Sequence, residues 1–268
     1  MKKFAQYAGS VACIALIQTP AVAVELYPGA PGACAVSQVN GKISADAGQT
    51  RDAGRKGRKN KSRKGGLFQG AASLSIPLNC SYGFQLDAAV GSLDGKSTGG
   101  AAAHAFTRNP DSYLLGAYGE YSAVGNNDIW RAGAEAEYYL NNITLSGLVG
   151  YENSNRTSGD VFAAVDAALY ATENFRITAG YRRFLDIDAA AFGAEYQFTG
   201  SAASVFVSGQ VGDKKHRTVL AGLRFYFGGT DKSLIRRHRE DDPFNRLNEL
   251  VRNIKTASST TIGGGEGD

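Results

Sequence analysis

Apolar and polar residues alternate along much of this chain, and this alternation is the feature that most constrains its fold. In the segment 217–227, Val219 and Phe225 fall on one side of an extended chain, whereas Arg224 falls on the other. A period of two residues is the signature of a β-strand whose two faces lie in different environments. We therefore expect strands with one apolar face and one face of polar or very small residues.

The same test predicts twelve strands of about ten residues, each bounded by Gly, Asn, Asp, Ser or Pro. They are expected at 34–46, 66–78, 82–92, 98–108, 112–123, 128–140, 142–152, 159–170, 174–184, 188–198, 202–211 and 217–227. Short links follow the even-numbered strands, and longer polar links follow most odd-numbered ones. This layout, with an even strand number and both chain ends beside the short turns, is typical of a bacterial transmembrane β-barrel. The expected fold class is all-β, an antiparallel up-and-down barrel.

A secreted soluble β-barrel binding protein is one alternative, since it would bury the same apolar face inside. Its outer face would then be polar, yet the second face here is rich in Gly and Ala and carries sparse charges. The 34 glycines, 13 tyrosines and 13 phenylalanines suit turns and strands better than helices. These observations favour a barrel whose apolar face contacts lipid.

The N-terminus predicts export. It begins with the basic "MKK", continues with the apolar "AGSVACIALIQTP", which is too short to span a bilayer as a helix, and reaches a small-residue cleavage site, "AVA", at 21–23. We expect a signal peptide at 1–23 that is cleaved after Ala23. A barrel domain at 24–227 and a periplasmic tail at 228–268 follow.

The signal peptide, the series of strand pairs and the last strand, "LAGLRFYF", resemble the outer-membrane β-barrel, porin-like proteins of Gram-negative bacteria. In that family the closing strand commonly carries an aromatic-ending assembly signal and ends the protein, whereas residues 228–268 follow it here. The resemblance implies a location in the outer membrane, with its lipid as a partner. It is specific for architecture alone, because the fold hosts pores, enzymes, adhesins and purely structural barrels.

The face opposite the lipid lines the lumen of such a barrel. Ten charged residues are expected there: Asp87, Glu120, Arg131, Glu135, Glu137, Asp166, Arg176, Arg182, Glu195 and Arg224. Eight strands fill their interior with side chains and sixteen leave a channel, so a barrel of about twelve is intermediate. We expect a small-solute pore or a structural membrane protein.

A barrel-borne outer-membrane hydrolase is a further alternative. Ser73, Asp87 and His104 are expected at nearly the same height on three consecutive strands, but with Asp87 between the other two. Nucleophilic catalysis needs the histidine within hydrogen-bond reach of the serine. His104 also lies two residues from the apolar Phe106, on the same side of the strand, so a lipid-facing His104 is an alternative. We therefore expect no enzyme activity. Without clustered Cys or His we also expect no metal site and no cofactor.

Two cysteines remain after the signal peptide. Cys34 starts the first expected strand and Cys80 lies in the turn after the second. If these strands pair antiparallel, both cysteines lie at the same periplasmic end, where an oxidising compartment would join them. A Cys34–Cys80 disulfide is expected, with two unpaired thiols as the alternative.

A basic run follows the first expected strand. Its eight cations are Arg51, Arg55, Lys56, Arg58, Lys59, Lys61, Arg63 and Lys64. The run predicts a loop, at about 47–65, that contacts polyanions such as lipopolysaccharide phosphates, with a solvated loop as the alternative. Nucleic acid is not an expected partner, because no aromatic residues lie between the charges to stack on bases.

The tail contains "DDPFNRLNELVRNIKT", in which Asp242 can cap a helix and Pro243 can start it. Leu247 and Val251 belong to one apolar stripe. We expect a short amphipathic helix at about 243–255 that packs on the barrel mouth or binds a periplasmic partner.

Overall fold

The computed structural model describes residues 34–52, 63–156, 158–185, 187–213, 216–229, 232–241, 243 and 247. The expected signal peptide lies outside these ranges, as do residues 53–62 of the basic run. Of the helix expected at about 243–255, only Pro243 and Leu247 are described.

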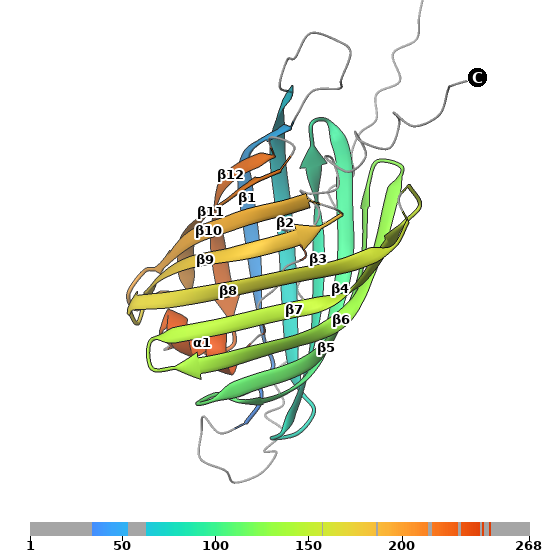
Figure 1. Cartoon of the computed structure of the whole chain (residues 1–268). Helices are drawn as coiled ribbons and strands as arrows, with labels where there is room; N and C mark the ends of the chain where they lie inside the picture. Colours follow the sequence, from blue (N-terminus) through green and yellow to red (C-terminus); the bar gives the residue numbers. More distant parts are fainter. Residues whose placement is uncertain are drawn as a thin grey trace, which may run out of the picture.

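The described residues form a closed barrel of twelve strands (Figure 1). The strands are β1 (Asn40–Asp52), β2 (Arg63–Pro77), β3 (Tyr82–Leu93), β4 (Lys96–Asn109), β5 (Tyr113–Val124), β6 (Asn127–Leu140), β7 (Ile143–Ser154), β8 (Asp160–Thr172), β9 (Phe175–Phe184), β10 (Ile187–Gln197), β11 (Ala203–Gly212) and β12 (Arg217–Phe227). Each strand pairs antiparallel with the next, and β1 pairs with β12 to close the sheet. Closure leaves no strand edge without hydrogen bonds. The expected all-β antiparallel barrel is confirmed.

The two faces of the wall differ in chemistry, as the alternation predicts. Phe68, Val90 and Leu223 point outward and are 61%, 69% and 64% exposed. Gln69 and Asp87, on the same strands, point inward and are buried. Such a continuous exposed apolar surface is typical of a barrel surrounded by lipid.

The first strand differs from its expected bounds. It begins at Asn40 instead of residue 34, because residues 34–39 run along the barrel mouth. Ser37 holds this segment in place, since its amide donates to the carbonyl of Glu240 and its hydroxyl to Asp241. Beyond its expected end β1 continues to Asp52, paired with β2 on one side and, as far as Arg51, with β12 on the other.

Two of the longer links expected after odd-numbered strands, those after 82–92 and after 112–123, are instead tight turns. The chain turns there at Asp94–Gly95 and at Gly125–Asn126, and the polar residues around these turns continue the strand ladder. Asp94 and Gly95 have φ angles of 53° and 76°, the left-handed conformation that a two-residue hairpin turn requires. At these positions the expected contrast between short turns and long loops is therefore absent.

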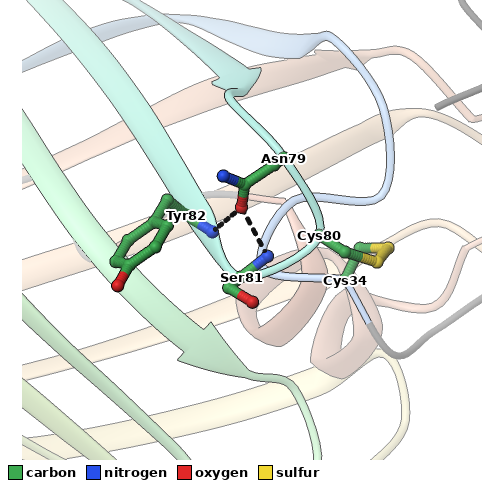
Figure 2. Close-up of a disulfide and its surroundings, with 5 residues drawn as sticks. All are labelled: Cys34, Asn79, Cys80, Ser81 and Tyr82. Atoms are coloured by element: carbon green, nitrogen blue, oxygen red, sulfur yellow. Dashed lines mark hydrogen bonds between the residues drawn. A yellow bond between two sulfur atoms is a disulfide. The ribbon is translucent and has the colours of Figure 1, made fainter. Parts of the chain in front are cut away.

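The expected disulfide is present. Cys34 is joined to Cys80, with 4.2 Å between their Cα atoms and a sequence separation of 46 (Figure 2). The Ala35 amide donates to the carbonyl of Cys80 at 2.7 Å. The side-chain oxygen of Asn79 accepts hydrogen bonds from the amides of Ser81 and Tyr82, which fixes the turn that carries Cys80.

A short helix, α1 (Leu234–Glu240), follows β12 and was not expected from the sequence. It lies at one end of the barrel, within its outline (Figure 1). The Leu234 amide donates to the side chain of Asn174 and the Ile235 amide to the carbonyl of Glu173, both in the turn between β8 and β9. Within the described ranges no helix has the length and apolar character needed to cross a bilayer.

Candidate functional site

The ten charged residues expected in the lumen all lie on the inner face of the barrel wall. Nine of them are buried, and Arg224 is partly buried with its side chain 18% exposed. Seven of them belong to three groups of ion pairs on different parts of the wall. Arg182 and Asp166 form a separate pair at 2.9 Å, and Glu137 accepts a hydrogen bond from the Tyr139 hydroxyl at 2.9 Å.

The first group centres on Arg131 of β6. Its guanidinium contacts Glu120 of β5 at 2.9 Å and Glu152 of β7 at 2.8 Å. The Arg131 carbon Cζ also lies 5.5 Å from the centre of the Phe184 ring. The side chains of this arginine and both carboxylates are almost completely buried. One cation therefore joins three neighbouring strands inside the barrel.

The second group contains the residues of the rejected catalytic triad. His104 Nε2 lies 2.9 Å from Asp87, and His104 Nδ1 lies 2.9 Å from Glu135. Asp87 pairs in register with Ser73 and also interacts with its hydroxyl. Asp87 therefore lies between Ser73 and His104, as the sequence predicts. In this order the carboxylate, and not the histidine, lies beside the serine.

His104 faces the lumen and not the lipid. His104 is 1% exposed. Phe106, the apolar neighbour that made a lipid-facing His104 possible, also points inward and is 3% exposed. Phe106 packs with Val36, Leu114 and Tyr139 in an apolar cluster under the N-terminal segment. The ring therefore fills the barrel mouth, which explains why an aromatic residue occupies the inner face there.

The third group centres on Glu195 of β10. It contacts Arg176 of β9 at 3.0 Å and Arg224 of β12 at 2.6 Å. It also accepts hydrogen bonds from Ser204 at 2.7 Å and from the Tyr226 hydroxyl at 2.8 Å. One carboxylate therefore holds two arginines against the inner wall.

A cavity of about 70 Å³ lies between these ion pairs and the tail. Its wall includes Lys42 of β1, Glu137 of β6 and Arg176 of β9, and the tail contributes His238 and Pro243. Charges of both signs and several hydroxyl groups therefore border one polar space inside the barrel. A space of this size and polarity can hold water.

An apolar cluster also lies inside the barrel. Its members are Leu67, Leu93, Val124, Ile129, Leu185 and Leu220, with Phe206 packed against it. Leu93, Val124 and Leu185 lie beside the turns opposite α1. This end of the lumen therefore holds an apolar cluster beside buried polar side chains such as Thr98 and Gln69.

The other end holds α1. Leu234 is completely buried in a cluster with Ala168, Tyr170 and Tyr226 of the inner wall. The Arg237 guanidinium lies 5.0 Å from the centre of the Tyr226 ring and donates to Gln197 at 3.1 Å. This arrangement shows that the helix is bound by the inner surface of the barrel.

His238 is the titratable group at this contact. Its Nδ1 lies 2.9 Å from the Tyr170 hydroxyl and its Nε2 lies 3.1 Å from the Tyr226 hydroxyl. The charged groups around it are Lys42, Arg176, Glu195 and Arg224. Burial and the charges of Arg176 and Arg224 hold the pKa of His238 well below its usual range, against the attraction of Glu195.

This lowered pKa predicts that acid weakens the binding of α1. When α1 is released from the barrel, His238 takes up a proton near its ordinary pKa of about 6.5, whereas it stays neutral when α1 is bound. The binding of α1 is therefore unaffected above this pH and weakens as the pH falls below it. The measurement is the hydrogen-exchange protection of the Arg237 amide, which donates to the Ser233 carbonyl at 3.0 Å. In His238→Gln the loss of protection at acid pH should disappear. Equal loss in both proteins would contradict the assignment.

Sequence reasoning missed several of these inner residues. Three of them lie on expected strands, at Lys42, Glu152 and Phe184. The alternation of inward and outward residues along these strands could have assigned them to the inner face. Arg237 and His238 had no such signal, because the polar "RRHRE" sequence is typical of a solvated segment.

The basic run is described only at its two ends. Arg51 is exposed on β1 and pairs in register with Lys64 of β2, which begins at Arg63. The remaining cations, Arg55, Lys56, Arg58, Lys59 and Lys61, lie outside the described residues. Within the described part of the chain, no three His, Cys, Asp or Glu side chains are arranged to hold a metal ion.

The barrel is similar to outer-membrane proteins of known structure. It superposes on an outer membrane channel from Pseudomonas putida F1 with a TM-score of 0.54 and 15% identity, over 76% of this chain and 99% of that one. For the KdgM porin in complex with disordered oligogalacturonate, the TM-score is 0.51 and the identity 7%, over 68% of this chain and 98% of the porin. The chain has the outer-membrane β-barrel fold. The translocator domain of the autotransporter NalP from Neisseria meningitidis also matches, with a TM-score of 0.50 and 11% identity, over 72% of this chain and 89% of that domain.

No family model and no curated protein matches the sequence. These three similar structures are a channel, a porin and a translocator domain, so the shared outer-membrane β-barrel fold does not by itself select one activity.

Proposed function

We propose that the protein is an outer-membrane channel for small polar solutes in a Gram-negative bacterium. The observation that carries this proposal is the inner wall of the barrel. Buried ion pairs and hydroxyl groups surround a polar cavity there, while the outer face is apolar. Fixed charges of both signs along a lumen are the groups that replace the hydration of a passing polar solute or ion.

The location is supported by three features. The outer apolar face fits lipid, the fold is that of outer-membrane barrels, and the N-terminal sequence predicts export. The Cys34–Cys80 disulfide fits an oxidising compartment such as the periplasm. We place this disulfide and α1 at the periplasmic end, which puts the basic run outside the cell, where lipopolysaccharide phosphates are its proposed partners.

Catalysis is not part of the proposal. A hydrolase of the serine type needs a histidine that accepts the serine proton, and His104 is instead held between the carboxylates of Asp87 and Glu135. This arrangement neutralises charge inside the barrel, which is a structural role.

A structural membrane barrel without conduction is the second candidate function. The apolar cluster around Leu93 and Leu220 at one end and α1 at the other favour it, because both occupy the lumen. The two candidates differ in a single property, the passage of solutes.

Swelling of proteoliposomes tests the channel. Full-length protein, shown to be folded by heat-modifiable gel mobility, should admit a pentose faster than a disaccharide and should exclude a large dextran. Swelling no faster than that of protein-free liposomes for every solute, both in the full-length protein and in Arg237→Ala, which loses a contact that holds α1 in the lumen, would reject the channel and leave the structural barrel.

A further inference from the structure

The chain reverses direction directly after β12. Gly228 and Gly229 have φ angles of 77° and 82°, a left-handed conformation that other residues rarely adopt. A Cβ atom on Gly228 would also lie 2.8 Å from the carbonyl oxygen of Val39, so only glycine fits there. The sequence "FGG" therefore ends the barrel with a turn that directs the tail back toward its mouth.

The tail then binds the inner wall on several sides. Gln197 of β10 donates to the carbonyl of Lys232 at 2.8 Å, and Arg239 donates to the carbonyl of Ile143 at the start of β7 at 2.8 Å. Lys232 also contacts Glu240 and the Ser37 hydroxyl of the N-terminal segment. Together with the burial of Leu234, these contacts hold α1 across the mouth.

The tail also reaches deep into the barrel. Pro243 borders the central cavity, and Leu247 is completely buried. A Cβ atom on Gly100 would lie 3.0 Å from Cδ1 of Leu247 and 2.9 Å from the carbonyl of Tyr121. Gly100 lies on β4 near its start at Lys96, the end of that strand away from α1. Leu234 therefore lies at the α1 end of the lumen, Pro243 at the central cavity, and Leu247 beside Gly100.

The part of the lumen around Leu247 is polar and imperfectly paired. Thr98 and Ser122 lie beside Gly100, and the Thr98 and Ser122 hydroxyls and the Gln69 and Gln210 amides are buried without a hydrogen-bond partner among the described residues. Buried polar groups of this kind are rare, because each is less stable there than in water. Withdrawal of the tail would let water reach these groups, which lowers the cost of opening.

We propose that the tail residues 232–241, together with Pro243 and Leu247, act as a displaceable plug that keeps the lumen closed and opens it when it withdraws. The plug rests on the proposed channel function, whose pathway it occupies. Its occupant is the chain's own tail, and its binding site is the inner wall between the β8–β9 turn and Gly100.

The test uses full-length protein with two single substitutions on α1. Arg237→Ala removes the buried contacts to Tyr226 and Gln197, whereas Arg236→Ala removes the same charge from a side chain that is 53% exposed and pairs with Glu240. A Leu247→Cys reporter, added to each, is labelled by a soluble maleimide when the plug leaves. We expect Arg237→Ala to raise labelling and conductance on the order of tenfold, because the loss of one hydrogen bond of a charged group weakens binding by about this factor. Arg236→Ala should change neither labelling nor conductance.

The outcomes separate the plug from the channel. Unchanged labelling in both Arg237→Ala and Leu234→Asp would show that the tail cannot be displaced. If labelling rises but the conductance of a barrel that already conducts does not, the tail does not close the lumen. Either result overturns the plug and leaves the channel. If displacement is seen but no folded form conducts, the proposed channel fails and the plug with it.

Discussion

Replacing Arg131 with leucine is expected to destabilise the barrel by about 3–5 kcal/mol. The substitution leaves Glu120 and Glu152 buried without their shared cation. The free energy of unfolding in urea can be followed by the fluorescence of Trp130, the single tryptophan of the sequence, which faces outward.

Arg183→Leu is the matched control on β9. Arg183 lies 3.5 Å from both Asp160 and Asp188, but these pairs are open to solvent, so the stability should change little. Equal losses in the two variants would show that burial does not decide the value of these ion pairs.

A charge on the outer face is expected to have the second large effect. Leu223→Arg places a guanidinium on the most exposed part of β12, at a cost of about 2–4 kcal/mol if this position lies near the bilayer midplane. The fraction folded after refolding into lipid, read from heat-modifiable gel mobility, should fall. In a water-soluble barrel the same substitution on an exposed position would cost little.

Leu223→Phe keeps the outer face apolar and should refold as well as the wild type. If Leu223→Arg refolds equally well in lipid, the outer face does not contact hydrocarbon, and the transmembrane assignment of this strand is wrong.

The faces of the strands could be predicted because they depend on local information. A side chain on a strand alternates sides whatever its partners are, so Arg176 and Arg224 were assigned inward from their neighbours alone. The order of Ser73, Asp87 and His104 followed as well, because consecutive strands of an up-and-down barrel lie side by side.

The contacts between distant strands could not be predicted in the same way. From the sequence, Glu195 is a candidate partner of Arg224, but Glu135 and Glu137 are candidates on the same grounds, because all face the lumen. Alternation does not choose among them, whereas the closed barrel brings Glu195 of β10 to Arg224 of β12. Helix α1 was missed because its Arg237 and His238 are polar, and an apolar stripe is the usual sign of a buried helix. In a lumen lined with charges, a buried helix can carry arginine and histidine instead.

The most direct test of the central claim is the current carried by single molecules of the folded full-length protein in a planar lipid bilayer. A lumen lined by the ion pairs of Arg131, Glu195 and Asp87, closed by a plug that can leave, predicts discrete current steps separated by closed periods. Arg237→Ala should lengthen the open periods, and Arg236→Ala should not. A bilayer that stays silent with both variants, although the inserted protein is shown to be folded, would contradict a conducting lumen.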